Sequence, residues 1–173
     1  SNLASGTTYT WTATPSSATV SGFTASGNTA FLPVQTLVNN SSIQQSVTYT
    51  ITPSANACNG TAVTYTIYVN PAPNILFSSP NQVICSGTAT NLVSISSSSS
   101  PVNFTWNTTY PATINGLGFV NTGSSSIPAQ TFINTTNVPV VINFAVSASL
   151  SGSVTCPGAT ANYLVTVNPP INI

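Results

Sequence analysis

The chain of 173 residues contains no Lys, Arg, Asp, Glu or His, and no Met. General acid–base catalysis near neutral pH depends on these ionisable side chains, so a Ser or Thr nucleophile would have no base. Metal sites need carboxylates or clusters of Cys and His, whereas this chain has three widely separated Cys and no CxxC pair. The composition therefore predicts that the protein is not an enzyme, with no catalytic residue, no cofactor and no metal site.

The absence of positive charge excludes a further class of partner. Nucleic-acid binding draws much of its affinity from Lys and Arg that neutralise phosphates, so no nucleic-acid partner is expected. Zero net charge also removes the usual protection against association, and Ser, Thr and Asn must solvate the surface instead. No internal apolar segment approaches the roughly 20 residues of a transmembrane helix.

What is present is an alternation of apolar and small polar residues. Hydrophobic residues make up 41% of the chain and aromatic residues 9%, enough to supply a core and to argue against a disordered Ser/Thr-rich stalk. A period of two predicts half-buried strands. The inward rows are Val47, Tyr49 and Ile51; Val63, Tyr65, Ile67 and Val69; Ile142, Phe144, Val146 and Ala148; and Tyr163, Val165 and Val167. Tyr68 falls on the outward face.

Helical periodicity is nearly absent, and turn residues interrupt the chain at short intervals. Turns are expected at Ser26-Gly27-Asn28, Asn59-Gly60, Gly123 and Pro157-Gly158, among other places. Many short strands separated by turns favour an all-β sandwich or barrel over a parallel sheet with crossover helices.

The chain also repeats itself. The stretch ACNGTAVTYTIYVNPAP has a near-twin in TCPGATANYLVTVNPP, and Cys58 matches Cys156 at an offset of 98 positions (156 − 58). Upstream, Trp11 matches Trp106 at an offset of 95 (106 − 11). A repeat near one hundred residues is the size of an immunoglobulin-like sandwich. We therefore expect tandem immunoglobulin-like β-sandwich domains joined by a short Pro-rich linker around Asn70-Pro71-Ala72-Pro73-Asn74.

The repeat register predicts the domain boundaries and the state of the cysteines. The position that matches Cys85 in the first repeat falls ahead of residue 1, so residues 1–72 are expected to be the C-terminal part of a truncated repeat and residues 73–173 a complete one. We predict a Cys85–Cys156 disulfide, with Cys58 unpaired in this fragment; three buried free thiols and a Cys58–Cys85 bridge are the alternatives. A disulfide would indicate a location outside a reducing cytosol.

Several motifs together identify a family resemblance. The runs ICSGTATNLVSIS and VTYTITPSANACNG, the YTW and FTW strands and the Val-Asn-Pro exits resemble the PKD-like, immunoglobulin-like repeats of very large surface adhesins of gliding Bacteroidota. The resemblance spans both repeats. It implies a segment of an extracellular, cell-surface filament that is secreted by the type IX system, is driven along the cell surface and adheres to the substratum.

The same resemblance implies the partners. They are neighbouring repeats of the same chain, an extracellular substratum or surface polysaccharide, and the outer-membrane secretion and motility machinery, reached through regions outside this fragment.

The sequence also suggests roles for three individual aromatic residues. Trp11 and Trp106 are expected to pack in the cores, and the alternative is an exposed platform for stacking on sugars. Tyr68 is a candidate for contact with a partner or a neighbouring domain. Two other function classes remain open, namely a carbohydrate-binding module and a structural surface-layer or fibre subunit whose unguarded strand edges pair between chains.

Overall fold

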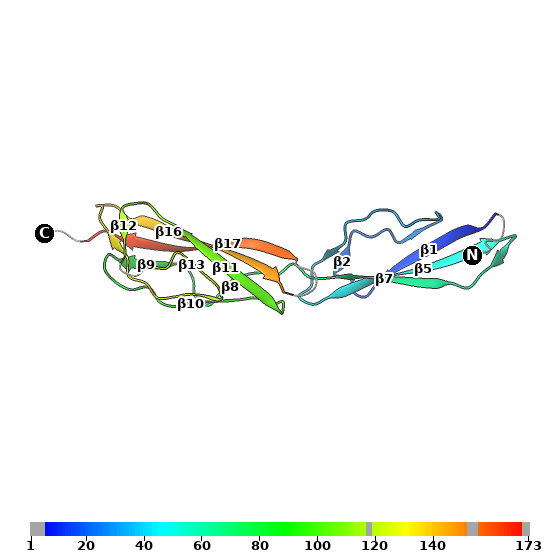
Figure 1. Ribbon diagram of the computed structural model, residues 1–173, viewed down its shortest axis with the longest axis horizontal. Coiled ribbons are helices and arrows are strands. Elements are labelled where there is room, and N and C mark those ends of the chain that lie inside the picture. The colour runs from blue at the N-terminus through cyan, green and yellow to red at the C-terminus, as the bar shows by residue number, and fades with distance from the viewer. Residues whose placement is uncertain (1–5, 117–118, 152–155, 171–173) are drawn as a thin grey trace. The chain divides into compact units, whose positions relative to one another are not determined.

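The computed structural model describes residues 6–116, 119–151 and 156–170. It is all-β, with no helix among those residues, and it divides into two compact units, Ser1–Pro71 (unit 1) and Ala72–Ile173 (unit 2). Figure 1 shows the strands of each unit. The architecture is that of tandem immunoglobulin-like β-sandwich domains, as the sequence predicts.

Unit 2 contains a five-stranded sheet in the order β13-β11-β16-β17-β9. Neighbouring strands are antiparallel, except that β9 runs parallel to β17. The bounds are β9 Gln82–Cys85, β11 Val102–Thr109, β13 Thr122–Gly123, β16 Val140–Leu150 and β17 Pro157–Asn168.

A smaller sheet completes the sandwich of unit 2. It has the order β14-β10-β8, where β8 is Leu76–Phe77, β10 is Val93–Ser96 and β14 is Ser126–Ile127. A separate pair joins β12 (Ile114–Asn115) to β15 (Ile133–Asn134). The core packs the inward rows of both sheets together, with Val93, Trp106 and Phe144 among its buried members.

Unit 1 repeats the larger sheet. Its strands β1 (Thr8–Pro15) and β5 (Gln45–Ala55) pair along their length, and β3 (Ser26–Gly27), β6 (Cys58–Asn59) and β7 (Val63–Val69) flank them. Strands β2 (Val20–Ser21) and β4 (Val38–Asn39) form the small pair. The buried core consists of Trp11, Val20, Val47 and Tyr49. Within the described residues, unit 1 has no counterpart of β8, β9 and β10.

Two glycine positions that suggested turns lie in strands instead. Trp11 is opposite Gly27 and Trp106 is opposite Gly123 in the antiparallel ladders. Each glycine lies against the face of its tryptophan ring, where a Cβ would overlap the ring. The turn expected at Pro157-Gly158 likewise falls inside β17, because this strand extends to the end of the hairpin.

The alternation in β7 predicted the wrong burial for two residues. Val63 and Tyr65 were expected to face inward, yet they are 63% and 56% exposed, while Ile67 and Val69 are half-buried. Tyr68 is exposed, on the outward face. Periodicity shows which residues share a face, but burial also requires a second layer above that face.

Candidate functional site

The two tryptophans lie in the cores, on the central strands β1 and β11. Trp11 and Trp106 are each 4% exposed, and each packs edge-on against one aromatic ring, Tyr49 at 5.9 Å and Phe144 at 5.6 Å between ring centroids. The indole nitrogen of Trp106 donates to the carbonyl of Ser126 at 3.0 Å. Buried rings offer no face to a sugar, so neither tryptophan is a stacking platform in this structure.

A buried asparagine in each unit is a structural feature that sequence reasoning missed. In unit 2, the Asn134 side chain is 1% exposed and donates to the carbonyls of Val138 at 2.7 Å and Val167 at 2.9 Å. Its Oδ1 accepts from the backbone N–H of Thr136 at 2.9 Å and from the hydroxyl of Thr136 at 2.7 Å. One amide thereby ties the loop after β15 to the last strand of the unit.

Asn39 makes the same bonds in unit 1. It donates to the carbonyls of Ile43 and Val69, each at 2.8 Å, and accepts from the backbone N–H and hydroxyl of Ser41. The detectable signal was the repeat of Asn-X-Ser/Thr at an offset of 95 positions (134 − 39). Because the chain is rich in Asn, that signal alone does not distinguish a buried, hydrogen-bonded asparagine from one on the surface.

The predicted Cys85–Cys156 disulfide is not formed in the structure, where Cys58, Cys85 and Cys156 are free. Cys85 is opposite Asn168, the last residue of β17, whereas Cys156 precedes the first residue of the same strand. A strand of that length separates the two by roughly 35 Å, while a disulfide requires Cα atoms within about 7 Å. The sequence spacing gave no information on which end of the sheet each cysteine occupies.

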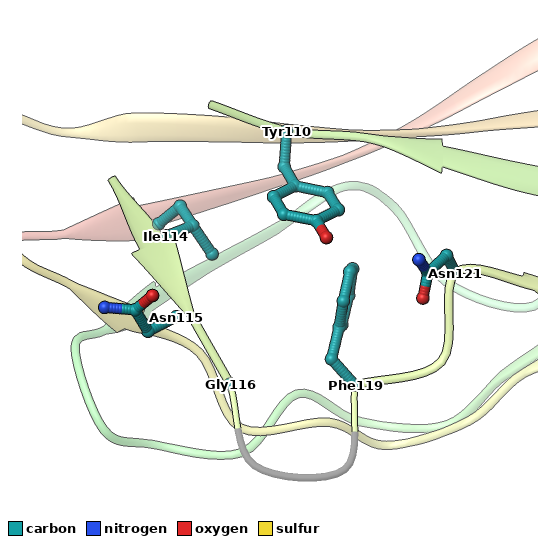
Figure 2. A pocket seen from close by; sticks show the side chains of 6 residues that line it. All are labelled: Tyr110, Ile114, Asn115, Gly116, Phe119 and Asn121. Carbon is teal, nitrogen blue, oxygen red and sulfur yellow. The ribbon is translucent and has the colours of Figure 1, made fainter. Parts of the chain in front are cut away.

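Unit 2 also has an open pocket of about 490 Å³, lined by Tyr110, Ile114, Asn115, Gly116, Phe119 and Asn121. Figure 2 shows that the rings of Tyr110 and Phe119, which both line it, point toward each other. Their centroids are 4.7 Å apart with the planes at 89°. Phe119 in turn packs edge-on against the fully buried Phe132 at 5.3 Å, so this wall of the pocket is anchored to the core.

The chemistry of this pocket is neutral. Its lining offers aromatic surface, the phenol of Tyr110 and the amides of Asn115 and Asn121. Such groups can stack on a ligand ring and exchange hydrogen bonds. In unit 1 the position of Tyr110 is taken by Pro15, at the same offset of 95 (110 − 15), so that position supplies no aromatic ring there.

Within the described part of the chain, no group of three or more metal-ligating side chains occurs. None of the elements found in those residues is a helix long and apolar enough to cross a membrane.

The shared features define the class of protein. Both units have the same central strand pairing, the same tryptophan–glycine contact and the same buried asparagine, as expected of tandem immunoglobulin-like modules. The PKD-like domain family matches residues 2–73 and again residues 82–170, and the chain belongs to that family. PKD-like domains are generally non-catalytic modules of extracellular or surface proteins. A search of curated proteins gives no match to this chain.

Proposed function

We propose that this chain is a non-catalytic repeat segment of a large, secreted cell-surface adhesin filament, acting as a stalk in gliding motility. The observation that carries the proposal is the occurrence of two consecutive PKD-like units in one chain. The sequence motifs resemble those of the gliding-motility adhesin SprB. That resemblance supports type IX secretion and a location on the outer surface of the cell.

The physical properties of the units suit a stalk. Each unit has its own hydrophobic core, so each can fold independently and keep its dimensions when the chain is pulled. The connection around Asn70-Pro71-Ala72-Pro73-Asn74 is short, and its prolines restrict the backbone. Because few freely rotating backbone bonds lie in this connection, force applied at one end of such an array is transmitted to the next unit.

The test uses cells that make the full parent protein. Antibodies raised against the purified chain should label intact, non-permeabilised cells, and removal of both units in frame should shorten the surface filament while leaving it secreted. For a stalk, we expect cells to attach normally and to glide with altered speed. Failure to label intact cells, or normal filament length and gliding after the deletion, would contradict the proposal.

A second candidate function rests on the pocket of unit 2. Aromatic surface beside neutral amides is the combination used to bind uncharged sugars, so this pocket could make unit 2 adhesive toward surface polysaccharide. We expect Tyr110→Ala to abolish retention of the chain on a polysaccharide column. The matched control is Tyr68→Ala, which removes another exposed tyrosine from unit 1. Equal retention of both variants and the parent chain would exclude binding in this pocket.

A further inference from the structure

The outward face of the larger sheet of unit 1 is built mainly of threonine. The alternation that directs Trp11, Val47 and Tyr49 into the core places the intervening residues of β1, β5 and β7 on the opposite face. The threonines among them, here called the threonine face, are Thr8, Thr10, Thr12 and Thr14 on β1, Thr48, Thr50 and Thr52 on β5, and Thr64 and Thr66 on β7. Those of β1 and β7 are exposed, and those of the central strand β5 are partly exposed.

Strand pairing aligns these threonines in two directions. Along each strand they recur at every second residue, which spaces them by about 6.7 Å, while neighbouring strands lie about 4.8 Å apart. The rows that cross all three strands are Thr12–Thr50–Thr64 and Thr14–Thr48–Thr66, and Thr10 is opposite Thr52 in a third row. The threonine face is therefore a two-dimensional lattice of identical side chains.

The side chains of this lattice are restricted in rotation, and most of their hydroxyl groups are available. Threonine is branched at Cβ, which limits its χ1 angle. The Oγ1 atoms of Thr48 and Thr66 lie 3.2 Å apart in a hydrogen bond, and Thr8 donates to the carbonyl of Ser54 at 3.2 Å. The remaining hydroxyls of the threonine face make no side-chain hydrogen bond to a described residue, so they can bind an external partner.

The sandwich fold does not require such a face, as unit 2 shows. The matching positions lie 95 residues later for β1 and β5 (145 − 50) and 98 residues later for β7 (162 − 64). They hold a mixture of residues, namely Asn103, Thr105, Asn107, Thr109, Asn143, Ala145, Ser147, Asn162 and Leu164. Because both units belong to one family, the uniform lattice is a property of unit 1 and not of the fold.

The chemistry of the threonine face restricts the kind of partner. The chain has no charged side chain, so a charged ligand would gain no ion pair there and would lose part of its hydration. The matching partner is a neutral, ordered surface that both donates and accepts hydrogen bonds at these two spacings. The prism face of ice has these properties, because its waters do both and its oxygen repeats are close to the two spacings. Water beside the threonine methyl groups is also restricted in orientation.

We propose that the threonine face of unit 1 binds ice. The hydroxyls of the two three-stranded rows take oxygen positions in the outermost layer of the lattice, and the methyl groups lie between those positions. The twist of a β-sheet limits the match to neighbouring rows near the centre of the face. We therefore expect the chain to shape ice crystals and slow their recrystallisation, with little depression of the freezing point.

The test measures whether the whole chain enters growing ice. Ice is grown slowly on a cooled probe in a dilute solution of the chain, and the protein in the ice fraction is quantified by its absorbance. We expect enrichment in ice relative to an unrelated soluble protein, and faceted crystals under a microscope. Exclusion of the chain from ice, together with round crystals like those in buffer, overturns the proposal.

Matched substitutions assign the binding to the threonine face. Thr50→Tyr puts a bulky side chain at the centre of a three-stranded row and should remove most of the enrichment in ice. Ala145→Tyr, at the same position of unit 2, should leave it unchanged. Circular dichroism checks that each variant is folded. Equal enrichment of the two variants would show that ice binds elsewhere or not at all.

A second pair of variants avoids the partly buried central strand. Thr64→Tyr lies on the exposed strand β7 and should also reduce enrichment, whereas Asn162→Tyr at the matching position of unit 2 should not. Sedimentation with crystalline cellulose tests the other kind of ordered, neutral surface. If the chain sediments with cellulose in a way that Thr64→Tyr abolishes, and ice excludes it, the threonine face binds a polysaccharide and the proposal is wrong.

Discussion

At the residue scale, the protein replaces charge with close contacts between small and large neutral side chains. The pairs Trp11–Gly27 and Trp106–Gly123 show this most directly, because each ring occupies the space that a side chain on the glycine would fill. The glycine is required here for close approach and not for a turn. An aromatic ring over a strand glycine is a known way to stabilise a position that otherwise weakens a sheet.

Gly123→Ala is therefore expected to destabilise unit 2. A methyl group on Gly123 would lie 2.5 Å from Cζ2 of Trp106, and the buried ring has little room to move. Overpacking of this kind costs about 1–3 kcal/mol. The free energy of unfolding in urea measures the effect, with the exposed neighbour Thr122→Ala as the control. A loss no larger than that of the control would show that the ring shifts freely.

The cysteines allow a second prediction at this scale. Since the sheet separates Cys85 from Cys156, non-reducing peptide mapping of the native chain should give no Cys85–Cys156 peptide. Alkylation under native conditions should modify the exposed Cys58 and Cys85 before the half-buried Cys156. Detection of a Cys85–Cys156 peptide from the folded protein would contradict the register of β9 on β17.

At the element scale, buried amides fix how loops join strands. Asn134 and Asn39 each satisfy two carbonyls and two donors, so each connects its loop to the last strand without any charged group. Buried polar groups stabilise a fold when all their hydrogen bonds are made, and they are costly when one partner is removed.

Asn134→Ala is expected to cost about 2–4 kcal/mol, because it removes the donor from the buried bond to the carbonyl of Val167 and from the part-buried bond to the carbonyl of Val138. Hydrogen exchange should also rise selectively near the C-terminal end of β17. The exposed Asn137→Ala serves as the control for removing an amide from the same loop. A cost below about 0.5 kcal/mol, the usual range for surface substitutions, would mean that the bonds of Asn134 contribute little.

At the scale of the whole molecule, the absence of charge determines the response to solution conditions. No ion pair exists to be screened, and the sequence has no side chain of a type that titrates between about pH 4.5 and 7. We expect the midpoint of thermal unfolding to be constant over this pH range and from 0.05 to about 0.5 M NaCl. A shift of more than a few degrees in either series would show that another effect controls stability.

The division into two units leads to the last prediction. Each unit has a separate core, and unit 1 leaves Tyr65 and Val63 exposed, so thermal unfolding should show two transitions with unit 1 melting first. Gly27→Ala should lower only the first transition and Gly123→Ala only the second. A single transition that both substitutions lower equally would instead show that the units unfold together.

The sequence by itself determined the fold class, the repeat and the burial of both tryptophans, because these depend on local alternation and on a motif written twice. It also limited the chemistry, since composition decides which reactions have a proton donor or acceptor. The PKD-like family match agrees with the motifs of both repeats.

Only the tertiary structure decided which residues meet across the sheets. It separated Cys85 from Cys156, placed Gly27 and Gly123 against the tryptophans and exposed Tyr65 while burying Tyr163. The physical reason is that a period of two assigns a residue to a face, whereas burial and pairing depend on which strand lies beside or above that face. In unit 2 that strand is β9, and its residues lie 83 positions earlier in the chain than their partners in β17 (165 − 82).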